Sequence, residues 1–271
     1  MAAMAPLVHT GGPFLVAFLR LFPAGLSLLI SVPFLGRNLS IDRNDLGWFV
    51  IFTVVDASLF QMFLARGLAE TGAGLGSVLI DSQPLIVALL ARTIFGDAIN
   101  PIGWIGLILG LVGIICLGIP FEILKNWLLL GHNSSSSLWA PGEAWMLAAA
   151  MAMALGTVLI RFVCRKSDPV AVTGWHMFFG SFPLLLGHIL QKDFLLTPNW
   201  SLFEWSLMGY ASLFGSALAY GLFFWFANRE ELTSFSTLAF LTPVFALASG
   251  GFWLGERLDL FQWIGVVVVL I

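Results

Sequence analysis

The run PFLVAFLRLFPAGLSLLISVPFL, residues 13–35, decides the fold class, because Arg20 is its only charged residue. A helix needs about 20 consecutive apolar residues to cross the roughly 30 Å hydrocarbon core of a bilayer. The run meets that length. It therefore predicts a membrane-spanning helix, and runs of the same kind recur along the chain.

The composition of the whole chain indicates the same class of protein. Apolar residues make up 59% of the 271 residues, charged residues only 10%, and the mean hydropathy is +0.96. A soluble domain of this size has too little interior to bury so much apolar surface. The 25 Phe and 11 Trp suit a surface that meets lipid and headgroups. The net charge of −3 gives no indication of a nucleic-acid partner.

Nine apolar segments emerge, the last of them about half a span long. They run approximately over Pro13–Leu35, Gly47–Ala65, Gly72–Phe95, Pro101–Phe121, Gly142–Val163, Pro169–Leu190, Phe203–Ala227, Leu232–Leu254 and Phe261–Ile271. The connections are short except for Glu122–Pro141, where Ser134–Ser137 indicate a flexible linker. We therefore divide the chain into residues 1–121, the linker 122–141 and residues 142–271.

The distribution of basic residues sets the expected orientation. One set of alternate connections carries Arg37, Arg43, Arg92, Arg161, Arg165, Lys166 and Arg229, and the other carries Arg66, Lys125, Lys192 and Arg257. Cytoplasmic loops carry an excess of Lys and Arg. The first set is therefore expected in the cytoplasm and the Ser-rich linker outside.

An internal repeat relates the two halves of the chain. A shift of 159 positions places Gln61 on Tyr220, Ser77 on Ser236, Pro84 on Pro243, and Trp104-Ile105-Gly106 on Trp263-Ile264-Gly265. A shift of 156 places Pro13 on Pro169 and Arg20 on His176. Each repeat is expected to hold five spans, an odd number, so the second repeat must lie upside down relative to the first. Inverted repeats are an architecture of secondary transporters.

The repeat also predicts the size of the parent fold. The first-half partner of Gly142–Val163 would lie upstream of Met1, and Phe261–Ile271 stops short of its own partner. The parent is therefore expected to have ten helices, of which this sequence holds nine with the last truncated. Met1–Gly12 carries no Lys or Arg, so no cleavable signal peptide is expected.

Several stretches resemble the EamA branch of the drug/metabolite transporter superfamily, and the likeness covers almost the whole chain. They are Pro13–Arg20 (PFLVAFLR), Leu241–Ala246 (LTPVFA), Leu254–Leu258 (LGERL) and Gln262–Gly265 (QWIG). Three more are similar to plastid and cyanobacterial members related to the "walls are thin" proteins: Gly76–Leu85 (GSVLIDSQPL), Thr173–Met177 (TGWHM) and Phe214–Gly221 (FGSALAYG). The resemblance implies ten helices, cytoplasmic termini and secondary transport of metabolites without ATP. Family substrates include amino acids, nucleobases, amines and drugs, so the resemblance selects none of them.

Four ionisable side chains at membrane depth are the main candidates for a functional site, because a charge there is costly. Asp56 lies near the middle of its span, and Asp81 lies at a similar depth from the opposite side. Arg20 and His176 each follow the Pro that opens their helix by about seven residues, roughly 10 Å of depth, from opposite faces.

These side chains allow more than one interpretation. A buried carboxylate can carry a proton in step with a substrate, and we assign this role to Asp56, for which the sequence shows no evident cation partner. Arg20 and Asp81 enter from the same face, so they could instead neutralise each other and hold two helices together. His176 could bind substrate or protons, or form a hydrogen bond between helices.

Neutral polar residues and prolines complete the candidate set. Gln61, Gln83, Tyr220 and Thr242 could bind substrate by hydrogen bonds, with bonding between helices as the alternative. Pro84 and Pro243 are hinge candidates because each removes a backbone hydrogen bond deep in a span. Trp175 and Phe224-Trp225 are candidate cavity walls or lipid-facing rings.

These candidates are expected to converge on a cavity. We expect Arg20, Asp56, Asp81, His176 and Tyr220 to wall a cavity between the halves that contacts at least three of them, with Arg20 and His176 pointing inward. Arg20 would favour a substrate with an anionic group.

Other classes of function require motifs that the sequence lacks. No GxxxxGK[ST] loop is present, which argues against ATP-driven pumping. A protease would have to be built from Ser77 and His176, and a haem pair from His176 and His188, which share one helix. No Cys/His cluster suggests a metal, and Cys116 and Cys164 suggest no disulfide framework. We therefore expect no enzyme, no catalytic residue, no cofactor and no metal.

The sequence thus predicts an all-α membrane protein built as an inverted repeat of five-helix units. It is expected to move a small metabolite, such as an amino-acid-like solute, by alternating access, with proton coupling as an option. Its expected partners are the bilayer, the solute and protons, with a homodimer as a candidate assembly. The expected location is the cell membrane of a cyanobacterium or a plastid membrane. A passive channel, or a fragment that associates with other membrane subunits, is the alternative.

Overall fold

The computed structural model describes residues 5–70, 73–118, 141–190, 198–242, 244–245 and 260–270, and every element in them is helical. The elements before the linker are α1 (Ala5–Gly11), α2 (Pro13–Phe34), α3 (Leu46–Phe52), η1 (Thr53–Leu59), α4 (Phe60–Glu70), α5 (Ala73–Ile80), α6 (Gln83–Phe95) and α7 (Pro101–Gly118). Those after it are α9 (Pro141–Val163), α10 (Pro169–Ile189), α11 (Leu202–Ser212), η2 (Leu213–Leu218), α12 (Ala219–Ala227), α13 (Leu232–Thr237), η3 (Leu238–Phe240) and α15 (Leu260–Leu270).

Six of these helices are long and apolar enough to cross a membrane, which confirms an all-α membrane protein. They are Pro13–Phe34, Leu46–Glu70, Val78–Phe95, Gly142–Val163, Pro169–Ile189 and Leu202–Ala227. Pro101–Cys116 is a shorter apolar helix. The predicted span Leu232–Leu254 is described only as far as residue 245, and the linker lies outside the described residues.

Two element boundaries differ from the sequence prediction. The predicted span Gly72–Phe95 is interrupted by a turn at Asp81 and Ser82, between α5 and α6, and the stretch Val78–Phe95 that is long enough to cross a membrane includes this turn. Pro84 therefore lies in the first turn of α6, where its missing N–H has no intrahelical partner to lose. The second predicted span continues beyond Ala65 to Glu70 as α4.

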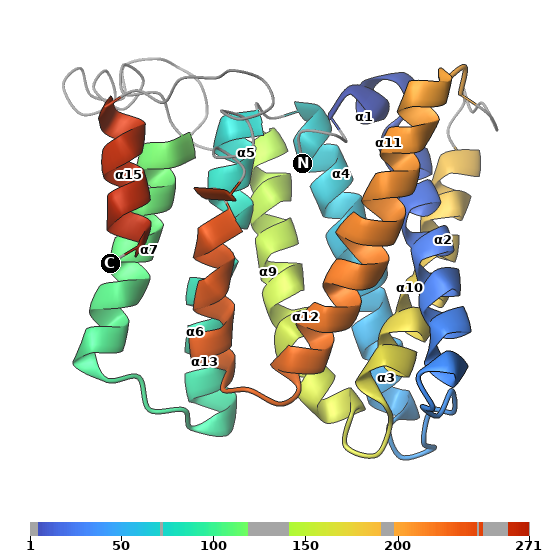
Figure 1. The fold of residues 1–271 in the computed structure, drawn as a ribbon, viewed down its shortest axis with the longest axis horizontal. Helices are drawn as coiled ribbons and strands as arrows, with labels where there is room; N and C mark the ends of the chain where they lie inside the picture. Colours follow the sequence, from blue (N-terminus) through green and yellow to red (C-terminus); the bar gives the residue numbers. More distant parts are fainter. Residues whose placement is uncertain are drawn as a thin grey trace.

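The helices stand side by side, and repeat-related helices run in opposite directions (Figure 1). In that view α2 descends whereas α10 ascends, and the α3–η1–α4 helix ascends whereas α11–η2–α12 descends. This arrangement is the one that an inverted repeat requires. Superposition of the two halves by rotation about an axis in the membrane plane stays a prediction.

The connections rich in basic residues meet at one end of the bundle, the lower end in Figure 1, which we call the basic end. Of the connections there, 35–45, 164–168 and 228–231 carry basic residues, whereas 96–100 carries none and follows Arg92 in the last turn of α6. Arg37 forms an ion pair of 2.8 Å with Asp168 there, and buried Asp45 accepts hydrogen bonds from the Lys166 backbone N–H and the Ser167 hydroxyl. These bonds tie the loop after α2 to the loop before α10.

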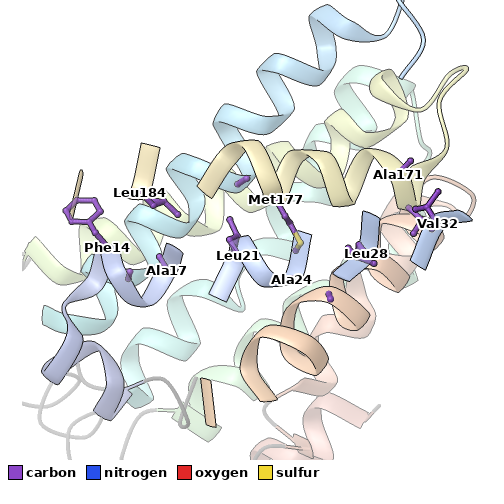
Figure 2. Close-up of a cluster of buried hydrophobic side chains, with 13 residues drawn as sticks. Phe14, Ala17, Leu21, Ala24, Leu28, Val32, Ala171, Met177 and Leu184 are labelled. Atoms are coloured by element: carbon purple, nitrogen blue, oxygen red, sulfur yellow. The ribbon is translucent and has the colours of Figure 1, made fainter. Parts of the chain in front are cut away.

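The helices α2 and α10 form the most extensive contact between the described elements. An apolar cluster fills this contact, with Leu21, Ala24 and Leu28 of α2 facing Met177 and Leu184 of α10 (Figure 2). Small residues permit the close approach, as is common between membrane helices. A Cβ atom added at Gly25 would lie 2.6 Å from the backbone nitrogen of Phe178.

Gly25→Ala should therefore destabilise the protein, although alanine is the better helix former. The added methyl group meets the backbone of α10, which can yield only if the two helices move apart, and we expect a loss of about 1–3 kcal/mol. Thermal unfolding in detergent is the measurement. Gly209→Ala in α11 is the matched control, because nothing lies within 4 Å of its Cβ position. Equal melting temperatures for the two variants would contradict the packing argument.

Candidate functional site

Asp56 and His176 form a buried pair between the two halves of the chain. Asp56 lies on η1 and His176 on α10. Their closest atoms, Asp56 Oδ2 and His176 Nε2, are 3.0 Å apart, and each side chain is 1% exposed. The sequence prediction that Asp56 lacks an obvious cation partner is corrected by this contact.

The hydrogen bonds of His176 show which of its nitrogens carries a proton. Nδ1 lies 2.6 Å from the carbonyl oxygen of Thr173, which can only accept, so Nδ1 is the donor. Nε2 of a neutral His176 is then an acceptor that faces a carboxylate oxygen, also an acceptor unless it is protonated. The contact of 3.0 Å therefore requires one further proton, held either on Asp56 or on His176.

The surroundings of the pair exclude water and leave one carboxylate oxygen without a partner. The His176 ring packs 4.4 Å from the ring of Phe52 and 5.6 Å from that of Phe224. Among the described residues, Asp56 Oδ1 and the nearby Thr53 hydroxyl are buried without a hydrogen bond. Gly156 faces this oxygen, because a Cβ atom there would overlap Oδ1. An unmet acceptor in such a place costs more on a charged carboxylate than on a neutral carboxyl group.

The backbone that carries Asp56 is a π-helix, and a second π-helix lies at the corresponding position of the other half. The shift of 159 places η1 (Thr53–Leu59) on residues 212–218, and η2 covers Leu213–Leu218. Short π-helical segments within α-helices occur frequently at functional sites. Both segments pack against the partner half, η1 on α10 and η2 on α2.

Arg20 forms the second contact between the halves, on η2. Its Nε donates a hydrogen bond of 2.7 Å to the hydroxyl of Ser216, which donates in turn to the carbonyl oxygen of Ala211. The Arg20 guanidinium also lies 6.0 Å from the ring centroid of Tyr220. Arg20 of α2 contacts η2, and His176 of α10 contacts η1. The repeat relates these two contacts, because Arg20 and His176 occupy corresponding positions.

Gln61 and Tyr220 meet between these two contacts. Gln61 Nε2 donates to the Tyr220 hydroxyl over 3.4 Å. The shift of 159 relates the two residues, and a residue can contact its own repeat partner only near the axis that relates the repeats. The structure therefore brings together five of the predicted site residues: Arg20, Asp56, Gln61, His176 and Tyr220.

The other predicted residues lie apart from this group. Gln83 donates to the Thr157 hydroxyl over 3.2 Å, and the Trp175 indole donates to the carbonyl oxygen of Leu39 at the basic end. Asp81 is half-buried in its turn, and the ion pairs of the described residues do not include Arg20 with Asp81. Thr242 is exposed, and Pro243 lies outside the described residues.

The expected cavity differs from the cavity that the structure describes. Arg20 and His176 are buried, 8% and 1% exposed, so both point inward. A groove of about 420 Å³ lies between α2, α10 and α12, and none of the five residues expected to wall the cavity lines it. The five residues instead pack against their neighbours or lie elsewhere, so this groove does not meet the expectation of a cavity that contacts at least three of them.

Sequence reasoning missed Ser216, Thr173 and Gly156. Ser216 carries the contact with Arg20, Thr173 fixes the tautomer of His176, and Gly156 makes room for Asp56. The two sequence shifts offered a signal for Ser216. The shift of 156 relates Arg20 to His176, and the shift of 159 relates Asp56 to position 215. A contact of His176 with Asp56 therefore implies a contact of Arg20 near position 215. Nothing in the sequence singles out Gly156.

Comparisons with known proteins identify relatives of the chain. The model of the EamA-like transporter family matches residues 1–119 and 140–271. An uncharacterised transporter of Synechocystis sp. is 47% identical over 100% of this chain and 83% of its own length. A chloroplastic WAT1-related protein of Arabidopsis thaliana is 44% identical over 100% of this chain, which spans 64% of that relative. A solved crystal structure has the same fold, with a TM-score of 0.76 over 99% of this chain and 89% of the other at 16% identity.

Proposed function

Because the chain belongs to the EamA-like transporter family, it is a multi-pass membrane transporter and not an enzyme, and we propose that it moves a small metabolite in exchange for or together with protons. The single observation that carries this proposal is the Asp56–His176 contact, whose geometry requires a proton. We propose a cyanobacterial or plastid membrane as its location, by analogy with the two relatives.

The pair is suited to couple a proton to movement because it joins the two halves. With the proton, Asp56 and His176 share a hydrogen bond, and η1 is held against α10. Without it, two acceptor atoms face each other in a dry site, which costs several kcal/mol and favours separation or hydration. Loss of the proton would therefore open the contact between the halves, which is the step that alternating access needs.

The solute would bind between the same elements. Arg20, Gln61 and Tyr220 supply a guanidinium, an amide and a phenol close to the axis. A guanidinium pairs well with a carboxylate, whereas the amide and phenol can each donate and accept. An amino-acid-like solute or another small organic acid is the class that these groups fit best.

The experiment begins with the purified protein and a panel of amino acids, organic acids, nucleobases and amines. A solute that binds the folded state raises the unfolding temperature, and the increase grows with the logarithm of the solute concentration above its Kd. Solutes that do so are then tested for uptake into proteoliposomes with an imposed pH gradient. We expect saturable uptake that the gradient accelerates and a protonophore abolishes.

A passive channel is the outcome that would contradict the proposal. Flux through a channel would rise linearly with solute concentration. The solute would move only down its own gradient, and the protonophore would not change the flux. Accumulation of solute against its own gradient separates the two cases, because only a coupled carrier can supply that work.

A further inference from the structure

The groove between α2, α10 and α12 has the form of a site for an acyl chain. Its volume is about 420 Å³, and its walls include Leu28 of α2, Leu35 just after the end of α2, and Leu222 of α12. Leu35 and Leu222 are 60% and 50% exposed, so the groove opens on the outer surface of the bundle. An apolar furrow on this surface faces lipid tails in the bilayer.

Two arginines lie where the groove reaches the basic end. Arg37 lines the groove just beyond the end of α2, and one of its nitrogens, Nη1, bonds to Asp168. Arg229 follows the end of α12 and stacks on the ring of Trp225, another lining residue, at 4.0 Å. Glu230 and Glu231 follow in the chain, and Glu231 accepts from the Ser234 hydroxyl. Arg37 thus lines the groove close to the basic end, and Arg229 lies beside the groove against Trp225.

At the position that corresponds to Trp225 in the other half, an arginine packs against aromatic rings. The shift of 159 relates Trp225 to Arg66, whose guanidinium lies 5.4 Å from the Phe14 ring and 5.6 Å from the Trp145 ring. Protein side chains therefore occupy the space next to Arg66 there.

We propose that this groove binds one phospholipid, with an acyl chain against Leu28 and Leu222 and the phosphate between Arg37 and Arg229. Guanidinium groups recognise phosphate by paired hydrogen bonds, and a basic residue near the membrane surface strengthens binding about five-fold. The lipid would cover the joint between α2 and the helix that carries η2, so its occupancy would stabilise the contact of Arg20 with Ser216. The site is distinct from the Asp56–His176 pair and does not depend on the transport proposal.

Native mass spectrometry of the delipidated 271-residue chain, with lipid added back, tests the proposal. The two probes are phosphatidylglycerol and diacylglycerol, which has acyl chains but no phosphate. We expect one retained phosphatidylglycerol and about five-fold weaker retention in Arg229→Gln. Arg92→Gln is the matched control, because Arg92 is an exposed arginine in the last turn of α6 at the same end but does not line the groove. Leu222→Trp, which fills the groove, should abolish retention.

Three results would overturn the proposal. If Arg229→Gln and Arg92→Gln lost the same amount of retained phosphatidylglycerol, general surface charge and not a specific site would hold the lipid. Equal retention of diacylglycerol and phosphatidylglycerol would remove the phosphate from the argument. A change of oligomeric state in Leu222→Trp, with lipid retention unaltered, would assign the groove to a second copy of the chain.

Discussion

Asp56→Asn should abolish proton-driven uptake while the protein still inserts and folds. The asparagine amide can donate to His176 Nε2 as a protonated Asp56 would, so the pair keeps its geometry of 3.0 Å. It cannot release that proton. We expect net uptake to fall on the order of 100-fold or more, the usual consequence of losing a proton-transfer group. Uptake into proteoliposomes under a pH gradient measures it.

Solute binding distinguishes a locked proton from a misfolded protein. A carrier fixed in its proton-bound form keeps its fold but does not alternate, so in Asp56→Asn counterflow should be lost while a solute still raises the unfolding temperature. Asp81→Asn is the comparison, because Asp81 is the other acidic side chain at membrane depth and lies in a turn away from His176. If uptake kept its pH dependence in Asp56→Asn but lost it in Asp81→Asn, the proton-carrying role would belong to Asp81.

The spans could be predicted from sequence because their apolar length is set by the bilayer, but their ends could not. Arg66 was read as the end of the second span, yet α4 continues to Glu70. The Arg66 side chain lies against the rings of Phe14 and Trp145, so its charge is accommodated by aromatic faces. The turn at Asp81 was missed because an apolar run around a proline does not show whether the helix bends or stops.

The depth of the site residues was predictable, whereas their partners were not. Pairing with Asp81 was one of two alternatives for Arg20, but Arg20 bonds to Ser216 and lies over Tyr220. Asp56 was expected without a partner, but it meets His176. Both contacts cross between halves through π-helical segments, whose extra residue per turn rotates side chains away from the positions that a regular helix gives. Such a change of register leaves no mark in apolar periodicity.

His176→Gln carries the second large expected effect, on the pH dependence of uptake. A glutamine amide can donate to ionised Asp56, so the contact no longer needs a proton to form. The contact between η1 and α10 would then persist at any pH, and deprotonation would no longer open it. We expect net uptake on the order of 100-fold slower, with a flat pH profile, measured at fixed solute concentration across a series of pH values.

The double variant tests whether Asp56 and His176 act as one unit. Residues that hold a single proton between them lose one function when either is changed, so Asp56→Asn with His176→Gln should be no slower than the slower single variant. Two independent roles would instead make the losses multiply. A double variant about 100-fold slower than either single variant would therefore separate the two residues and remove the shared proton from the mechanism.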